Sequence, residues 1–154
     1  MGDRSGAVAA DRLLFQTTDL LREKERFFSE LRTFAETMHW STPIENEIEL
    51  ILEEWWANLV NYAFGETNAP KVQIQIDSSA QTATIIVRDN GIAFDPVVRP
   101  DPDLSLPIEQ RPIGGLGIYM IKKLSTKISS ERVGKENILR LEKDLTRPVL
   151  GAKK

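Results

Sequence analysis

Apolar residues recur at steps of three and four over two segments in the first half of the chain, which predicts two amphipathic helices. The first begins at Thr18 or Asp19, whose side-chain oxygens can cap a helix, and runs to about His39. The second begins at residues 41–43, where a proline suits the first turn, and ends near Phe64. Its apolar stripe consists of Ile44, Ile48, Leu52, Trp55, Leu59 and Tyr62.

Alternating apolar and polar residues, together with β-branched side chains, predict strands in much of the remaining chain. The predicted strands cover residues 11–17, 72–76, 82–89, 126–132 and 137–143. Short turns between neighbouring strands favour two antiparallel hairpins, and the second hairpin turns at Gly134 and Lys135.

A long loop and a third helix lie between the two hairpins. Residues 95–113 contain five prolines and little periodicity, which is typical of functional lids and of disordered segments. An apolar helix follows over about 115–124. The order of elements predicts an α+β fold, a two-layer α/β sandwich whose mostly antiparallel sheet is covered by helices on one face.

A length of 154 residues fits one domain, which we expect over residues 11–145 between flexible tails at 1–10 and 146–154. The chain has no cysteine, which excludes disulfides, thiolate metal sites and cysteine nucleophiles. Its single histidine, His39, cannot form a histidine-rich metal cluster. Without disulfides or a signal-peptide pattern, a cytoplasmic location is expected.

Charge and hydropathy argue against nucleic-acid and membrane partners. The net charge is −3, from 20 basic and 23 acidic residues, and the basic residues form no stripe. The longest apolar runs span only a few residues, far fewer than a bilayer requires. We therefore expect neither direct nucleic-acid binding nor membrane association.

A first set of candidate site residues lies on the second predicted helix. Glu54, Asn58 and Asn61 are spaced four and three apart, so they share one edge beside the apolar stripe. A glutamate can accept a proton from a hydroxyl group, and the oxygen of an asparagine suits Mg²⁺. The same spacing also occurs on ordinary solvated helix edges.

A second candidate follows the first hairpin, in the segment Asp89-Asn-Gly91-Ile-Ala93-Phe. An aspartate at a strand end can accept a hydrogen bond from an exocyclic amine, and Gly91 would let the backbone approach a planar ligand. A plain Asx turn has the same residues.

A third candidate is the run Gly114, Gly115, Leu116 and Gly117, directly before the third helix. Backbone N–H groups at a helix N-terminus bind anions. No Gly-Lys-Ser/Thr follows, so the run is not a Walker loop. Met120 occupies the place of the third glycine of a dinucleotide fingerprint.

The order of these three motifs resembles the GHKL superfamily of ATPases and kinases, over about residues 10–145. Chain size and the segment 53–64 are similar to the anti-sigma-factor serine/threonine-protein kinases of bacterial partner-switching systems. The resemblance implies a histidine-kinase-like, Bergerat-type ATP-binding domain that uses ATP and Mg²⁺.

The resemblance also implies roles for the motif residues. Glu54 would be the catalytic base, Asn58 the Mg²⁺ ligand, and Asn61 would lie beside the phosphates. Asp89 would bind adenine, with Gly91 and Ala93 at the same pocket. The glycine run at 114–117, including Leu116, would meet the phosphates when the loop closes.

Several residues depart from the pattern of the resembled family. Ala93 replaces a second glycine and should narrow the pocket floor, and Tyr62 stands where relatives often carry histidine. Trp55 belongs to the core stripe, whereas Trp56 fits either a packing role or a partner surface. We hypothesise that Arg111 in the loop touches the terminal phosphate.

The leading hypothesis is therefore an ATP-dependent protein serine/threonine kinase of the anti-sigma-factor type. Its implied substrate is a serine of a small anti-anti-sigma (STAS) protein, and the resemblance extends to sequestering a sigma factor and to a homodimer. Two alternatives stay open. One is a nucleotide-dependent binding switch without kinase turnover, and the other is the detached ATPase domain of a histidine kinase.

Overall fold

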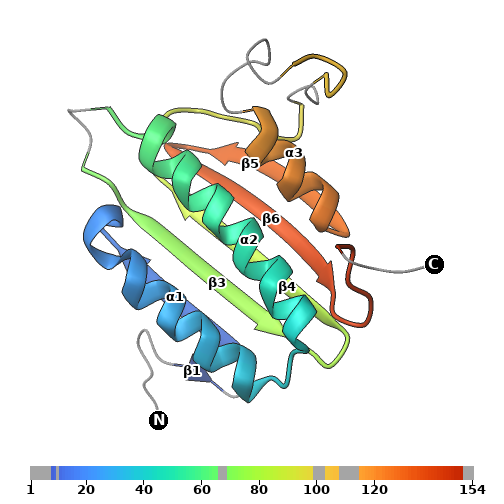
Figure 1. Ribbon diagram of the computed structural model, residues 1–154. Helices are drawn as coiled ribbons and strands as arrows, with labels where there is room; N and C mark the ends of the chain where they lie inside the picture. Colours follow the sequence, from blue (N-terminus) through green and yellow to red (C-terminus); the bar gives the residue numbers. More distant parts are fainter. Residues whose placement is uncertain (1–7, 10, 66–68, 99–102, 108–114, 151–154) are drawn as a thin grey trace.

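The computed structural model describes residues 8–9, 11–65, 69–98, 103–107 and 115–150, which form two layers (Figure 1). The helices are α1 (Leu20–Thr37), α2 (Thr42–Asn58), the π-helix η1 (Leu59–Ala63) and α3 (Gly115–Leu124). The strands are β1 (Val8–Ala9), β2 (Arg12–Thr17), β3 (Val72–Ser78), β4 (Thr82–Asp89), β5 (Lys127–Val133) and β6 (Glu136–Asp144).

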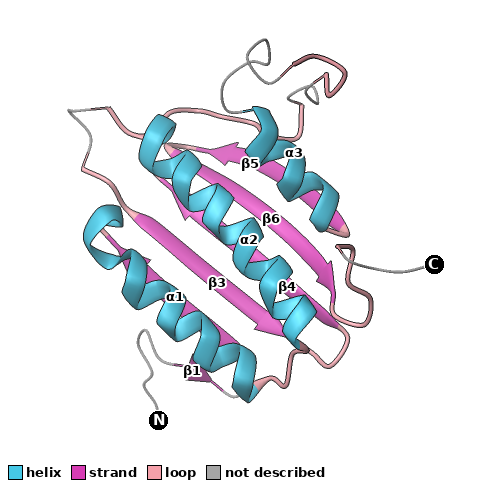
Figure 2. Ribbon diagram, in the orientation of Figure 1, coloured by secondary structure: helices cyan, strands magenta, loops and turns pink. Residues whose placement is uncertain are grey.

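All described strands belong to one antiparallel sheet in the order β1-β2-β3-β4-β6-β5. The helices α1, α2 and α3 cover one face of this sheet, as Figure 2 shows. The predicted α+β sandwich with helices on one face is therefore confirmed, as are the two hairpins and the third helix.

The two long helices begin at side-chain caps. The Asp19 carboxylate accepts a hydrogen bond from Arg22 N–H at 3.0 Å, and the Ser41 hydroxyl accepts one from Ile44 N–H at 3.4 Å. These bonds satisfy backbone donors that have no partner within the helix. His39, two residues after the end of α1, is exposed and has a φ of 60° in the turn between α1 and α2.

The core lies between the sheet and the helix layer and follows the predicted periodicities. On β3, Val72, Ile74 and Ile76 are buried beneath the helices, and the residues between them lie on the opposite face. Asp89, the last residue of β4, pairs with Val72 on one side and Asn137 on the other. The register thus brings two buried polar side chains together at one end of the apolar row.

Trp56 is a packing residue, so the alternative that it lines a partner surface is wrong. Its side chain is 2% exposed, and its ring stacks on Phe27 with centroids 5.4 Å apart. Its Nε1 donates to the Leu20 carbonyl at 3.1 Å. Trp56 is buried because α1 packs against the side of α2 that carries it.

The periodicity predicted one α-helix that continues to about Phe64, but the α-helical part ends earlier, at Asn58. After Asn58 it widens into the π-helix η1, in which Leu59 and Ala63 are both buried. The Ala63 carbonyl accepts the Ile92 N–H at 2.9 Å and so joins the helix end to the turn after β4. π-turns of this kind often occur at functional sites.

Parts of both expected tails make specific contacts. Val8 and Ala9 pair with β2. The Val149 and Leu150 N–H groups donate to the carboxylate of Glu47, which is 2% exposed and forms an ion pair with Lys143 at 2.5 Å. Burial alone would raise the pKa of Glu47, but these hydrogen bonds bring that pKa below its ordinary value.

Within the described parts of the chain, no helix is both long and apolar enough to cross a membrane.

Candidate functional site

A mostly apolar pocket lies where the end of α2 meets the turn after β4. It is lined by Trp55, Asn58, Leu59, Tyr62, Ala63, Asp89, Ile92, Phe94 and Asn137. Asp89 is 2% exposed, and its Oδ1 accepts hydrogen bonds from Gly91 N–H at 2.9 Å and Asn137 Nδ2 at 3.0 Å. No described residue donates a hydrogen bond to its other oxygen, Oδ2.

Asn137 is a site residue that the sequence analysis missed. Its Nδ2 donates to Asp89 and also to the Ile92 carbonyl at 2.7 Å. Its Oδ1 accepts from Phe94 N–H at 3.3 Å and from Arg132 Nη1 at 3.1 Å. One carboxamide on β6 thereby fixes both the Asp89 carboxylate and the loop that forms the pocket wall.

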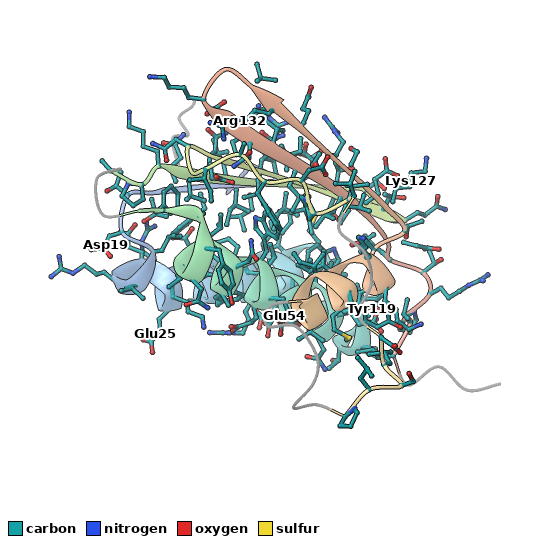
Figure 3. All side chains as sticks on the ribbon, turned by 90° about the horizontal axis from the view of Figure 1, so that it is seen from above. Asp19, Glu25, Glu54, Tyr119, Lys127 and Arg132 are labelled. Atoms are coloured by element: carbon teal, nitrogen blue, oxygen red, sulfur yellow. The ribbon has the colours of Figure 1, made fainter. Side chains whose placement is uncertain are left out.

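Arg132 supports the same loop from β5. Its Nη1 donates to the Gly91 carbonyl at 2.7 Å, in addition to the Asn137 oxygen. Figure 3 shows Arg132 and Lys127 at opposite ends of β5, on the sheet side of the molecule. The Arg132 guanidinium, near one end of β5, therefore lies close to the hydrogen bonds that Asn137 and Gly91 form with Asp89.

Burial raises the pKa of Asp89 above its ordinary value, because the charged carboxylate loses hydration. Hydrogen bonds from Asn137 and Gly91 and the charge of Arg132 oppose this rise by stabilising the ionised form. Asn137 and Arg132 are therefore part of the electrostatics of the pocket as well as its shape.

Gly91 has a packing role that the sequence analysis did not predict. A Cβ at this position would lie 2.5 Å from the Ala63 carbonyl oxygen and 2.9 Å from the Ala63 Cβ. The glycine thus permits close packing of the turn against η1. Ala93 is exposed, and the pocket is lined instead by its neighbours Ile92 and Phe94, so the expected narrowing of the floor by Ala93 is not seen.

A second hollow adjoins the first and contains the motif residues of α2. It is lined by Glu54, Ala57, Asn58, Asn61, Tyr62, Gly117 and Ile118. Asn58 and Tyr62 line both hollows, so the two lie next to each other. The structure therefore brings Glu54, Asn58 and Asn61 together, as their spacing predicted.

The second hollow closes where α3 meets α2. A Cβ on Gly117 would stand 2.6 Å from Glu54 Oε1, so this glycine lets α3 approach the carboxylate. Figure 3 labels Glu54 on α2 and Tyr119 on α3, the two helices that pack against each other here. Gly115 and Leu116 begin α3, whereas Gly114 and Arg111 lie outside the described residues.

The oxygen atoms of the second hollow fit Mg²⁺ bound together with phosphate groups. No group of three or more metal-ligating acidic or histidine side chains occurs in the described segments, so a site made of protein ligands alone is not formed there. Mg²⁺ instead takes one or two protein ligands together with phosphate oxygens and water. Among the described residues, no hydrogen bond occupies the Asn58 carboxamide.

A larger and more open hollow lies elsewhere, between the start of α1 and the uncovered face of the sheet. Gln73, Arg88 and Glu136 are among the residues that line it, together with Arg26. None of the three sequence motifs contributes to it. The two smaller hollows are therefore the better candidates for the chemistry.

The chain is similar to several known proteins. The serine/threonine-protein kinase BtrW of Bordetella bronchiseptica is 24% identical over 93 residues, which are 60% of this chain and 66% of that protein. The chain thus spans just under two thirds of this curated relative.

Two solved histidine kinase structures are also similar. One is the histidine kinase domain of the Erythrobacter litoralis EL346 blue-light activated histidine kinase, at 15% identity and a TM-score of 0.48, covering 92% of this chain and 66% of that one. The other is the catalytic domain of histidine kinase ThkA, at 17% identity and a TM-score of 0.45, covering 88% and 97%. Residues 18–143 match the histidine kinase-like ATPase domain, and the chain therefore belongs to that family.

Proposed function

We propose that this chain is an ATP-dependent protein serine/threonine kinase of the anti-sigma-factor type. The observation that carries the proposal is the junction of two hollows at Asn58, one holding the buried Asp89 and the other holding Glu54. A ligand with a planar base at one end and phosphates at the other fits this arrangement. The name of the relative BtrW supports a serine or threonine as the acceptor.

In the proposed reaction, the Glu54 carboxylate accepts the proton of a substrate serine hydroxyl. The serine oxygen forms a bond to the γ-phosphorus while the bond from that phosphorus to the β–γ bridging oxygen breaks, and ADP leaves. Glu54 suits this role because no described residue forms an ion pair or a hydrogen bond with it. Its side chain is partly exposed beside Gly117, so a substrate hydroxyl can reach it.

The other site residues bind and orient the nucleotide. Asp89 accepts a hydrogen bond from the exocyclic amine of adenine at Oδ2, while Asn137 and Gly91 hold Oδ1. Asn58 is the proposed Mg²⁺ ligand, and Asn61 lies beside the phosphates. Mg²⁺, when bound, would neutralise the phosphate charge that develops during transfer.

The proposed substrate is a small STAS protein with a phosphorylatable serine, and a sigma factor is the proposed second partner. Both follow from the likeness to anti-sigma-factor kinases. A pull-down from lysate of the source organism with Mg-ATP, read by mass spectrometry, tests both partners. A small partner that gains phosphoserine supports the proposal.

Three variants make the test specific. Glu54→Ala should abolish phosphate transfer and retain nucleotide binding, whereas Asp89→Asn should weaken binding itself. Glu53→Ala is the matched control, because Glu53 precedes Glu54 on α2 but forms an exposed ion pair with Lys24 at 2.9 Å. Its transfer rate should equal that of the wild type, and unimpaired transfer by Glu54→Ala would contradict the assigned mechanism.

Two further outcomes would overturn the assignment as a serine/threonine kinase. Acid-labile phosphate on the partner would indicate a phosphohistidine and thus a histidine kinase. A partner that is held only with ATP but never phosphorylated would indicate a binding switch.

A further inference from the structure

The three tryptophans differ in one respect that bears on the site. Trp40 Nε1 donates to the Ser78 hydroxyl at 3.1 Å, and Trp56 Nε1 donates to the Leu20 carbonyl at 3.1 Å. Trp55 is 4% exposed, and its Nε1 has no hydrogen-bond partner among the described residues. It is also the tryptophan that lines the Asp89 pocket.

An unpartnered donor in a buried position calls for a physical reason, because buried polar groups are almost always hydrogen-bonded. The other polar groups deep in this pocket are largely occupied. Asn137 uses both of its side-chain polar atoms within the protein, and Asp89 uses Oδ1. Besides Asn58 and Tyr62, which also line the second hollow, the acceptor Asp89 Oδ2 and the donor Trp55 Nε1 have no partner among the described residues.

Adenine complements this pair of free groups. Its exocyclic amine is a donor, and the ring nitrogens N1 and N7, on either side of the carbon that bears the amine, are acceptors. The mostly apolar wall of the pocket also suits the face of a planar base, and the Trp55 and Phe94 rings, which pack together with centroids 6.1 Å apart and planes inclined by 33°, form part of it.

We propose that Trp55 contacts the nucleotide, and that its indole N–H donates a hydrogen bond to N1 or N7 of the adenine base, directly or through one water. The inference deepens the proposed function and depends on its nucleotide site. On this proposal, Trp55 belongs to the apolar core stripe of α2 and also recognises the adenine base.

Nucleotide affinity of Trp55→Phe tests the proposal, since phenylalanine keeps a ring and removes the N–H. Affinity for Mg-ADP should fall roughly five- to tenfold, the usual worth of one hydrogen bond. Trp56→Phe is the matched control, because it also removes a buried indole N–H but does not line the pocket. Its affinity should equal that of the wild type, and equal affinity of Trp55→Phe would overturn the inference.

Base analogues separate a hydrogen bond from a merely structural effect. 1-deaza-ADP lacks N1, and 7-deaza-ADP lacks N7. The analogue that lacks the acceptor of the Trp55 hydrogen bond should bind the wild type and Trp55→Phe with equal affinity. The same loss with both analogues as with ADP would show that Trp55 only shapes the pocket.

The wild-type protein provides a measurement that does not depend on a variant. In a spectrum of ¹⁵N-labelled tryptophan, addition of Mg-ADP should move the Trp55 indole proton downfield and leave the Trp40 and Trp56 signals nearly unchanged. An unmoved Trp55 signal with bound nucleotide overturns this inference alone. Absence of any nucleotide binding would overturn the proposed function as well, whereas a failed phosphate transfer would leave this inference standing.

Discussion

Gly117 on α3 lies directly against the Glu54 carboxylate on α2, so that a methyl group on the glycine would stand 2.6 Å from Glu54 Oε1. Two helices that are separated in the chain by the β3–β4 hairpin and a long loop are thus fitted to each other at the proposed base. The contact involves the far end of a flexible side chain, and a larger residue at 117 would therefore move the carboxylate rather than the helices.

Gly117→Ala should consequently separate activity from stability. We expect phosphate transfer to fall at least about tenfold, because displacement of a catalytic group by about 1 Å has large effects on rate. The free energy of unfolding should stay the same or rise by up to about 1 kcal/mol, because alanine favours a helix over glycine. Gly65→Ala is the control, since a Cβ at Gly65 meets no atom within 4 Å.

Gly91→Ala should have the opposite profile. Its Cβ would meet the Ala63 backbone, which cannot rotate away, so the turn must shift. We expect a loss of roughly 1–3 kcal/mol in the free energy of unfolding, measured by urea denaturation, together with weaker nucleotide binding. A variant as stable as the wild type would show that the turn does not need this close approach.

Asn137→Ala should change the pH dependence of nucleotide binding. The Asn137 hydrogen bond lowers the pKa of Asp89, so its removal should raise that pKa further. The ionised carboxylate is the better acceptor, so nucleotide affinity falls as Asp89 becomes protonated. In Asn137→Ala, this loss on acidification should begin at a higher pH than in the wild type. Titration calorimetry with Mg-ADP between about pH 4 and 7, the range that spans ordinary and raised carboxyl pKa values, measures the shift. A parallel loss at every pH would contradict this role of Asn137.

Glu47→Ala should be the most destabilising of these substitutions. It leaves Lys143 buried without its counter-ion and removes the acceptor of the Val149 and Leu150 N–H groups. Loss of one partner of a buried pair costs about 3–5 kcal/mol. Glu53→Ala on the same helix removes an exposed pair and should cost no more than about 1 kcal/mol.

The same pair predicts how stability depends on pH. The folded-state pKa of Glu47 lies below its ordinary value of 4.5, so its contribution is present above that value and is lost as the pH falls through the lowered pKa. Glu47→Gln should therefore be less stable than the wild type at neutral pH, with a difference that shrinks in acid. Urea denaturation of both proteins at several pH values measures this difference in the free energy of unfolding. A difference that stays constant with pH would show that the charge of the Glu47 carboxylate does not matter.

Much of the fold could be predicted because buried residues recur every three to four positions on the helices and every second position on most of the strands, as the apolar residues of the sequence do. The row Asn137, Leu139, Leu141 and Lys143 on β6 also contained a signal, since polar residues at both ends share the buried face with leucines. What a single sequence could not supply was the β4–β6 register that sets Asn137 beside Asp89. Long-range pairing depends on how whole strands pack and not on local pattern.

The adjacent tryptophans show a similar limit. A helical stripe identified Trp55 as a core residue and left Trp56 undecided, yet both are buried. Trp56 packs toward α1, and Trp55 lines the pocket where β4 ends and β6 begins, so α2 is covered on two sides. Periodicity indicates one buried face of a helix but not that a second neighbour covers another.

The π-helix at Leu59–Ala63 has a consequence for how this chain tolerates changes in length. A π-helix accommodates one residue more per turn than an α-helix, and here that wider turn ends at the carbonyl that holds Ile92 N–H. Deletion of a single residue between Asn58 and Ala63 would restore α-helical winding and rotate that carbonyl away. A change of one residue in the 95–113 loop would leave this carbonyl in place, so functional variants should differ in length in the loop and not in the helix.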